Sequence, residues 1–229
     1  MLRPLLIMVA GRRNQEEFNF MPKSKCKICR RLNAKLFLKG DRCASSKCAM
    51  IKKPFPPGQK KKRRPDPVSE YNRGLREKQK LRNWYNLRER QFSNYVKKVL
   101  ARKNAAEDPA DLLIRELESR LDSVIFRMGF SESRIQAKKM VSHGYLLING
   151  KPVNIPSFQV SKGDVISVKS QKLGKGVFKN IQLLMKKRPV PNWIEVDDKK
   201  LEAKIKGVPT LEESASPADI SIIFGHYSR

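Results

Sequence analysis

The residues best suited to chemistry are four cysteines that all fall within 23 residues of the chain: Cys26, Cys29, Cys43 and Cys48. They form two close pairs, Cys-x2-Cys and Cys-x4-Cys, with a short loop between them. Two such pairs can bring four thiolates to the corners of a tetrahedron, which is the geometry that zinc prefers. A four-thiolate shell leaves no open coordination position, so we expect structural zinc and no metal catalysis.

The surroundings of the cysteines fit this interpretation. Six nearby cations would lower the thiol pKa values and offset the charge of four thiolates: Lys25, Lys27, Arg30, Lys39, Arg42 and Lys47. A segment this short cannot bury a real core, so the metal would hold its fold. Free thiols are the first alternative. A disulfide or redox pair is the second, and it is disfavoured because the sequence shows no secretion signal and no βαβ pattern around Cys26 and Cys29.

Charge is distributed unevenly along the 229 residues, whose formal net charge is +28. Residues 22–103 contain 27 basic and 5 acidic side chains, whereas residues 104–229 contain 20 basic and 15 acidic ones. A surface so densely cationic repels itself unless a polyanion neutralises it. The pattern therefore predicts a nucleic acid bound largely through its phosphates. A basic protein with no fixed partner is the alternative.

Composition indicates a globular protein with polar, basic extensions. Hydrophobic residues make up 39% of the chain, and the mean hydropathy is −0.58. The apolar run at residues 5–10 is too short to span a bilayer, and the acids that follow it are untypical of a secretory signal. We expect residues 1–21 to be a dispensable extension or an over-long start. A transit peptide is the alternative.

A basic arm follows the cysteines. Prolines at residues 54, 56 and 57 fix an extended backbone, and five consecutive cations come soon after: Lys60, Lys61, Lys62, Arg63 and Arg64. Such a run cannot pack against itself, so we expect an arm that becomes ordered along RNA phosphates. A nuclear-localisation signal is a weaker alternative.

Residues 69–103 carry apolar side chains at helical spacing, with Ser69 as the cap and a break between residues 83 and 93. The spacing favours a buried aromatic face over stacking on bases. Beyond it, residues 111–128 are amphipathic, and a second helix begins near Ser131 and stops at Gly144. Strand-like runs at 145–148 and 165–168 flank the hairpin signal Asn149-Gly150. We also expect a helix at 177–187 and a short strand at 220–224.

The candidate RNA contacts come from three places. The cysteine segment and arm supply Arg30, Arg31, Lys52, Lys53 and the cations of residues 60–64. The long helical stretch supplies Arg76, Lys80 and Arg82. One rim of the two-helix module supplies Arg134, Lys138, Lys139, Ser142, His143 and Lys151. For His143 a phosphate contact and a structural or surface role are both open.

A series of short motifs resembles one family, the bacterial small-subunit ribosomal protein four. The opening of that family is matched by Cys-x2-Cys-Arg-Arg, KLFLKG at 35–40, the cysteines at 43 and 48, PPGQ at 56–59 and LREKQKLR at 75–82. Its inserted RNA-binding module is matched by RLD at 120–122, RMGF at 127–130, VSHG at 141–144 and VNIPS at 153–157. WIEV at 193–196 and YSR at 227–229 match its ends. The paired cysteines match the zinc-bearing form.

The resemblance implies a primary binder of small-subunit ribosomal RNA that docks on a junction in the five-prime domain and nucleates assembly. It implies contact with ribosomal protein five and, together with ribosomal protein three, a lining for the messenger entry channel. Decoding accuracy would be influenced through the contact with protein five. The implied location is the cytoplasmic ribosome of a bacterium, with an organelle as the alternative. Residues 1–20 have no counterpart in the family.

These expectations define an α+β protein with a basic zinc-stabilised N-terminal segment, a mainly helical body, and an inserted RNA-binding module of two helices plus a small antiparallel sheet. The predicted domains are the extension at 1–21, the cysteine segment and arm at 22–68, the body with C-terminal tail at 69–107 and 182–229, and the module at 108–181, its core at about 120–169. We expect neither a membrane partner nor a homo-oligomer.

Two other functions compete with a ribosomal role. An RNA-modifying enzyme would need a catalytic domain, but the chain has 2 histidines and its acids fall mostly in solvated runs, so we expect no enzyme. A zinc-containing DNA-binding regulator would need a helix-turn-helix or similar reader, and a basic arm with a shape-reading module fits folded RNA better.

Overall fold

The structure of the protein is a computed structural model that describes residues 25–58, 69–102, 107–178, 181–187 and 189–228. The expected extension at 1–21 and the cations Lys60, Lys61, Lys62, Arg63 and Arg64 lie outside the described residues. Within these ranges, every helix is too short or too polar to cross a membrane.

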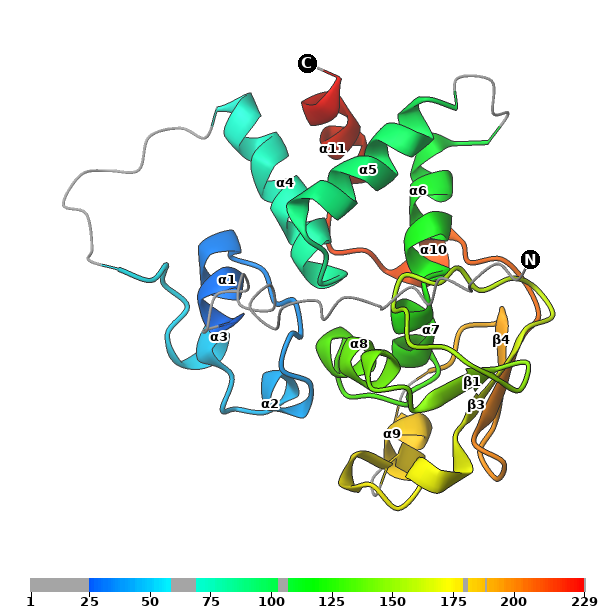
Figure 1. The fold of residues 1–229 in the computed structure, drawn as a ribbon. Helices are drawn as coiled ribbons and strands as arrows, with labels where there is room; N and C mark the ends of the chain where they lie inside the picture. Colours follow the sequence, from blue (N-terminus) through cyan, green and yellow to red (C-terminus); the bar gives the residue numbers. More distant parts are fainter. Residues whose placement is uncertain (1–24, 59–68, 103–106, 179–180, 188, 229) are drawn as a thin grey trace, which may run out of the picture.

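The cysteine segment contains three short helices: α1 (Lys25–Leu32), α2 (Asp41–Ala44) and α3 (Ala49–Lys52). They lie together on one side of the molecule (Figure 1). The segment buries a small apolar cluster of Cys29, Leu36 and Leu38. With so little apolar surface buried, the segment has a weak hydrophobic reason to fold by itself.

The body is built from five helices: α4 (Glu70–Trp84), α5 (Glu89–Leu100), α6 (Pro109–Glu118), α10 (Leu211–Ser214) and α11 (Ile220–Tyr227). Ser69 caps α4 as predicted, because its side chain accepts a hydrogen bond from the backbone N–H of Asn72. The predicted break after residue 83 is confirmed: the chain turns between α4 and α5, where Asn86 has a φ of 55°. The body core is formed by the apolar faces of α4, α5, α6 and α11.

The prediction of a strand at residues 220–224 is wrong, because these residues belong to helix α11. Asp219 caps the helix by accepting a hydrogen bond from the backbone N–H of Ile222. Ile220 and Ile223 are buried against the body core, and α11 packs along α4. A short apolar run fits either element, and here the cap and the packing surface on α4 select the helix.

The module begins with two helices, α7 (Leu121–Arg127) and α8 (Arg134–Ser142). The single helix predicted over residues 111–128 is divided into α6 and α7. At the break, the carbonyl of Ser119 accepts a hydrogen bond from the backbone N–H of Val160, and Arg120 forms an isolated bridge with Gln159. A backbone paired to another segment cannot continue a helix, and the sequence pattern alone carries no sign of this contact.

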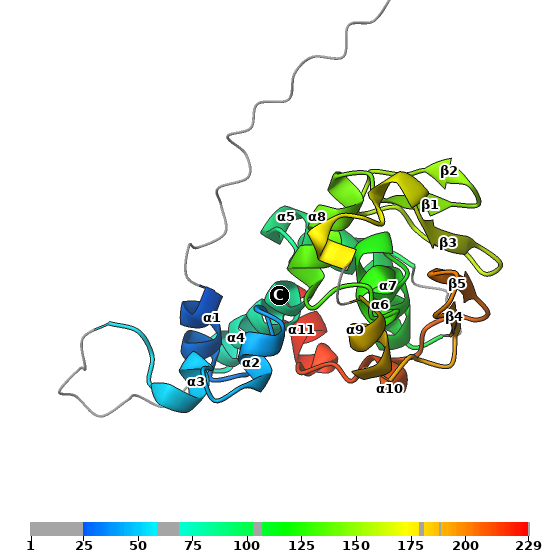
Figure 2. The same ribbon diagram turned by 90° about the horizontal axis from the view of Figure 1, so that it is seen from below.

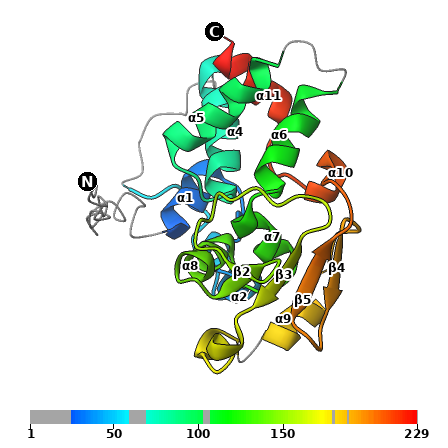
Figure 3. The same ribbon diagram turned by 45° about the vertical axis from the view of Figure 1, so that its right-hand side comes forward.

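One antiparallel sheet holds five strands in the order β2-β1-β3-β5-β4. The strands are β1 (Leu146–Ile148), β2 (Lys151–Pro152), β3 (Val165–Val168), β4 (Ile194–Asp197) and β5 (Glu202–Ile205). The predicted hairpin at Asn149-Gly150 is confirmed, with φ values of 49° and 78° that suit a two-residue turn. Strands β4 and β5 were not predicted, although Glu202–Ile205 alternates polar and apolar residues. Figure 3 shows β4 and β5 extending the sheet beside β3.

Between β3 and β4 the chain forms two short 3-10 turns, Ser170–Lys172 and Gly176–Phe178, and then helix α9 (Ile181–Lys187). The helix predicted at 177–187 is therefore shorter than expected. Packing also crosses the predicted domain ranges. Helix α6, assigned to the module range, lies in the body core, and β4 and β5, assigned to the tail, complete the module sheet.

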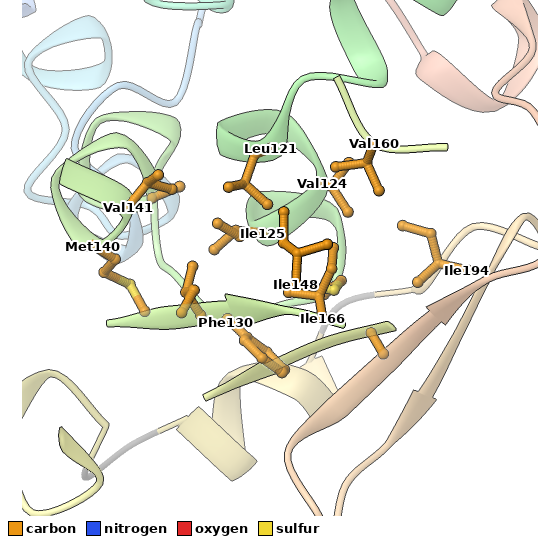
Figure 4. Packing of buried hydrophobic residues seen from close by; sticks show 14 of the residues in the cluster. Leu121, Val124, Ile125, Phe130, Met140, Val141, Ile148, Val160, Ile166 and Ile194 are labelled. Atoms are coloured by element: carbon orange, nitrogen blue, oxygen red, sulfur yellow. The ribbon is translucent and has the colours of Figure 1, made fainter. Parts of the chain in front are cut away.

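The largest hydrophobic core lies between α7, α8 and the sheet (Figure 4). Leu121, Val124 and Ile125 of α7 are completely buried, as is Ile166 of β3. Seen from below, helix α8 lies between the cysteine segment and the sheet (Figure 2). The coarse fold prediction is confirmed: a mainly helical body is joined to two helices on a small antiparallel sheet.

Candidate RNA-binding surface

All four cysteines line one pocket in the cysteine segment. Its volume of about 10 Å³ is close to that of one water-sized sphere, so it suits a single ion and not an organic molecule. The backbone N–H of Leu36 donates to the sulfur of Cys29, and that of Lys39 donates to the sulfur of Cys43 at 3.4 Å. Donors of this kind favour the thiolate form.

The chemistry of this donor set fits zinc, since four sulfurs from two close pairs face one pocket. In the part of the chain that the structure describes, no three His, Cys, Asp or Glu side chains are yet gathered in an arrangement that could hold a metal ion. Closure around zinc would require the four sulfurs to move together. Zinc therefore stays a prediction.

The expected lowering of the thiol pKa values does not hold for Cys29 and Cys43. Burial raises the pKa of Cys29, against the hydrogen bond from Leu36, and the neighbouring thiols raise it further. Burial likewise raises the pKa of Cys43, and the charge of Lys35 opposes this only in part. In this pocket, desolvation outweighs the nearby cations.

Three predicted RNA contacts of the cysteine segment share one open cavity. Arg30, Lys52 and Lys53 line a space of about 720 Å³. Two further cations line the same cavity, Arg42 and Lys47, which the RNA-contact prediction omitted because their position beside cysteines indicated only a role near the thiols. The fourth predicted contact, Arg31, is exposed on α1.

Arg30 is held in place within this cavity. Its Nε donates to the backbone carbonyl of Phe55 at 2.7 Å. The bond fixes the guanidinium plane, and a fixed fork of donors is suited to a phosphate group. The cavity therefore combines high positive charge with at least one pre-oriented donor.

The three cations predicted on α4 differ in their surroundings. Arg76 is exposed. Lys80 pairs with Glu77 at 2.6 Å, and Arg82 pairs with Glu89 at 3.1 Å. These pairs neutralise part of the charge, so Arg76 is the cation of this group that is most accessible to RNA.

The predicted rim of the module is largely exposed. Lys139, Ser142 and His143 are exposed at the C-terminal end of α8, and Lys151 is exposed on β2. The ring of His143 stacks on Tyr145, with centroids 5.8 Å apart and planes 29° from parallel. The stacking fixes the direction of the imidazole without removing it from solvent.

Lys138 is partly buried, and burial lowers its pKa, against the attraction of Asp122 and in the same direction as the charges of Arg120 and Arg88. Its stem therefore packs on the protein. Of the rim residues on α8, Lys138 presents less charge to solvent than Lys139.

Arg134 is not on the predicted RNA-facing rim, which corrects the sequence-based prediction. Its side chain is only 6% exposed. Its Nη2 donates to Glu118 at 3.2 Å, and its guanidinium lies 3.9 Å from the centre of the Trp84 ring. The spacing from Lys138 placed both residues on one face, but α8 turns its N-terminal end into the protein.

A group of acids lines a separate cavity of about 450 Å³ between α6 and α10. Three of its four acids have a structural partner. Asp108 caps α6, Asp111 accepts a hydrogen bond from the backbone N–H of Leu211, and Glu107 pairs with Arg115. The group is explained by helix ends and a surface ion pair, and it gives no indication of acid–base catalysis.

Comparison with known proteins accounts for most of the chain. A family model described as "Ribosomal protein S4/S9 N-terminal domain" matches residues 21–113, and a model described as "S4 domain" matches residues 119–166. The first match ends within α6, and the second begins at Ser119, directly after α6.

Relatives match over nearly their whole length. The small ribosomal subunit protein uS4 of Solidesulfovibrio magneticus is 42% identical over 206 residues, which cover 90% of this chain and 97% of that protein. The uS4 proteins of Desulfotalea psychrophila and Caldicellulosiruptor saccharolyticus are 45% and 44% identical, and each match covers 89% of this chain and 96% of the relative.

Proposed function

Since the chain belongs to the uS4 family of small ribosomal subunit proteins, we infer that it is a structural constituent of the small subunit that binds ribosomal RNA and is not an enzyme. The observation that carries this inference is the match over about nine-tenths of the chain. The concentration of positive charge in residues 22–103 supports it independently.

The function we infer is binding by two surfaces. The cavity lined by Arg30, Lys52 and Lys53 offers charge and a fixed guanidinium to phosphates. The rim of α8 with Lys139 and His143 offers a second, sparser set of contacts. Base edges in the major groove of A-form RNA are hard to reach, so selectivity would come from the spacing of the two surfaces matching a folded junction.

We extend this to the finer roles that the family resemblance implies. The protein would bind the five-prime domain of the small-subunit RNA, nucleate its assembly, and work in the cytoplasmic ribosome. Contacts with ribosomal proteins five and three, a place at the messenger entry channel and an influence on decoding accuracy belong to the same proposal. The three uS4 relatives named above are bacterial, which supports a bacterial setting.

Zinc is the cofactor we propose, held by Cys26, Cys29, Cys43 and Cys48. The support is the set of four sulfurs lining one ion-sized pocket and the small apolar cluster of the segment around it. When bound, zinc would supply structure alone, because four thiolates fill its tetrahedral shell. The cysteine segment would then present Arg30 and its neighbours in a fixed arrangement.

The test of this function is a binding comparison at about 0.3 M monovalent salt, where nonspecific phosphate binding is weakened. The full chain is titrated with the five-prime domain of small-subunit RNA and with an unrelated folded RNA of equal length. We expect a preference of roughly a hundredfold or more for the five-prime domain. Equal affinity for both would leave the protein as a general RNA binder and would contradict the ribosomal target.

A further inference from the structure

A buried ionic cluster lies behind the exposed face of α8. At its centre is Glu118 of α6, whose side chain is 1% exposed. Its carboxylate accepts hydrogen bonds from Arg127 at 2.6 and 2.9 Å, from Arg134 at 3.2 Å and from the hydroxyl of Tyr85 at 2.7 Å. The cluster thus joins α4, α6, α7 and α8.

Aromatic rings enclose the guanidinium of Arg134. Its central carbon lies 3.9 Å from the ring centre of Trp84, 4.7 Å from that of Tyr85 and 4.5 Å from that of Phe126. A flat cation held between rings and a carboxylate has a defined plane as well as a defined position. Since Arg134 is the first residue of α8, this fixes where the helix begins and which way it points.

The cysteine segment docks at the same place. Trp84 of α4 and Ile135 of α8 both pack against the cluster of Cys29, Leu36 and Leu38. Gly40 approaches the module so closely that a Cβ atom there would lie 2.7 Å from the Cβ of Glu132. The cysteine segment, the body and the module therefore meet around the position of Arg134.

The buried ionic cluster contributes more to the fixed orientation of α8 than to the net stability of the fold. Buried ion pairs add little net stability, because desolvation of the charges offsets their attraction, and apolar replacements are often equally stable. What the charged cluster supplies is direction, through the fork of Arg134, the two acceptor oxygens of Glu118 and the fixed rings around them.

We propose that Arg134 and Glu118 are positioning residues for RNA binding: they touch no RNA, and they hold the exposed cations of α8 in register with those of the cysteine segment. The inference rests on the proposed function. It assigns selectivity for one RNA shape to a buried pair, because two basic surfaces can discriminate a folded junction only if their separation is fixed. Binding to an arbitrary RNA needs charge alone and would not depend on the pair.

The test is a double-mutant cycle between the buried arginine and an exposed lysine of α8. Arg134→Met, Lys139→Ala and their combination are measured against the five-prime domain RNA and an unrelated folded RNA, below the melting temperature of each variant. We expect R134M to reduce the preference by about tenfold or more. Lys139→Ala should weaken RNA binding by the unaltered protein about threefold. It should have little further effect when Met replaces Arg134, because Lys139 is then no longer held at its position relative to the cysteine segment.

Arg115→Met is the matched control. Arg115 lies on α6 in an exposed ion pair with Glu107 at 2.7 Å, and its replacement removes the same charge. For R115M, the preference for the five-prime domain RNA should stay within about twofold of that of the unaltered protein. Should R134M fail to fold, Arg134→Lys retains the charge but loses the fork and the stacking, and an intermediate loss of preference is expected.

The proposal is overturned if Lys139→Ala has the same effect with and without Arg134, or if a folded R134M or R134K protein keeps the full preference. A merely structural role for Arg134 would lower stability and leave the effect of Lys139→Ala unchanged. If the unaltered protein shows no preference, it is the proposed function that fails; a preference in the unaltered protein that a folded Arg134→Met protein retains overturns this proposal alone.

Discussion

The cysteine segment and the module hold themselves together in different ways. The core around the module contains nineteen buried hydrophobic residues, whereas the core of the cysteine segment contains three. Burial of apolar area stabilises a fold in rough proportion to the area, so the module can fold on packing alone. The segment, with ten cations and one acid over residues 25–58, needs an additional set of bonds, for which its four cysteines are suited.

The densest charge and the most rigid core lie in different regions of this protein. The cysteine segment combines the densest charge with the weakest core, whereas the module combines sparse charge with a rigid core. A rigid module can keep its exposed cations in place, and a metal can do the same for a segment that packing cannot stabilise.

Removal of the proposed zinc should have the largest effect, and that effect should be confined to the cysteine segment. In a Cys26→Ser, Cys29→Ser protein, or after chelation, we expect residues 25–58 to lose their fold while the module stays folded, because only the segment depends on the thiolates. Amide NMR spectra of the two regions, together with zinc content, measure this.

Ser93→Ala on α5, a comparable small change away from the pocket, is the control and should leave both sets of amide signals in place. Unchanged signals from residues 25–58 after chelation would mean that packing alone holds the segment. The division between the two regions would then be wrong.

A cavity in the module core should destabilise the module and leave the cysteine segment folded. Leu121 is fully buried between α7 and the sheet, so Leu121→Ala should lower the free energy of unfolding by about 2–5 kcal/mol. Leu173→Ala is the control, because Leu173 is 44% exposed, and it should change stability by no more than about 0.5 kcal/mol. Denaturant unfolding measures both. Loss of zinc from the L121A protein under native conditions would show that the two regions fold as one unit.

Acid should act on the junction of body and module through Glu118. Burial opposes its ionisation, but the hydrogen bond from Arg127 and the charges of Arg134 and Arg127 outweigh burial and lower its pKa. Burial lowers the pKa of Arg134, yet a guanidinium remains protonated at neutral pH. A lowered carboxyl pKa contributes stability that is complete above the ordinary value, near pH 4.5, and is lost as pH falls through the lowered one.

We therefore expect the junction to be unaffected between pH 7 and 5 and to weaken only as the pH falls below the ordinary carboxyl value near 4.5, as followed by tryptophan fluorescence. Glu118→Gln should remove that part of the acid dependence. A transition at pH 6 in the unaltered protein, with Glu118→Gln showing the same curve, would assign the acid sensitivity to other groups.

Local signals in the sequence predicted local structure well. Ser69 as a cap, Asn149-Gly150 as a hairpin and the strand at 165–168 all depend on neighbouring residues, and all three are confirmed. Features decided by distant contacts were missed. The break between α6 and α7 depends on pairing with residues 159–160, and strand β5 exists because β3 and β4 flank it.

The candidate RNA-binding surface shows the same difference between what local sequence predicts and what distant contacts decide. Charge counting found the basic segment, since charge needs no tertiary information. Helical spacing misplaced Arg134, because spacing alone cannot show that the N-terminal end of α8 meets Glu118 and three aromatic rings. The RNA-contact prediction also omitted Arg42 and Lys47, which reach the shared cavity only through the fold of the cysteine segment.

Backbone footprinting of the protein on complete small-subunit ribosomal RNA, with and without zinc chelation, distinguishes two separately stabilised RNA-binding surfaces from one. We predict protections confined to the five-prime domain, in two groups, of which one disappears on chelation while the other, contacted by α8, persists. Protections scattered over the RNA, or a single group that chelation removes entirely, would contradict the account of two separately stabilised surfaces that bind one folded RNA.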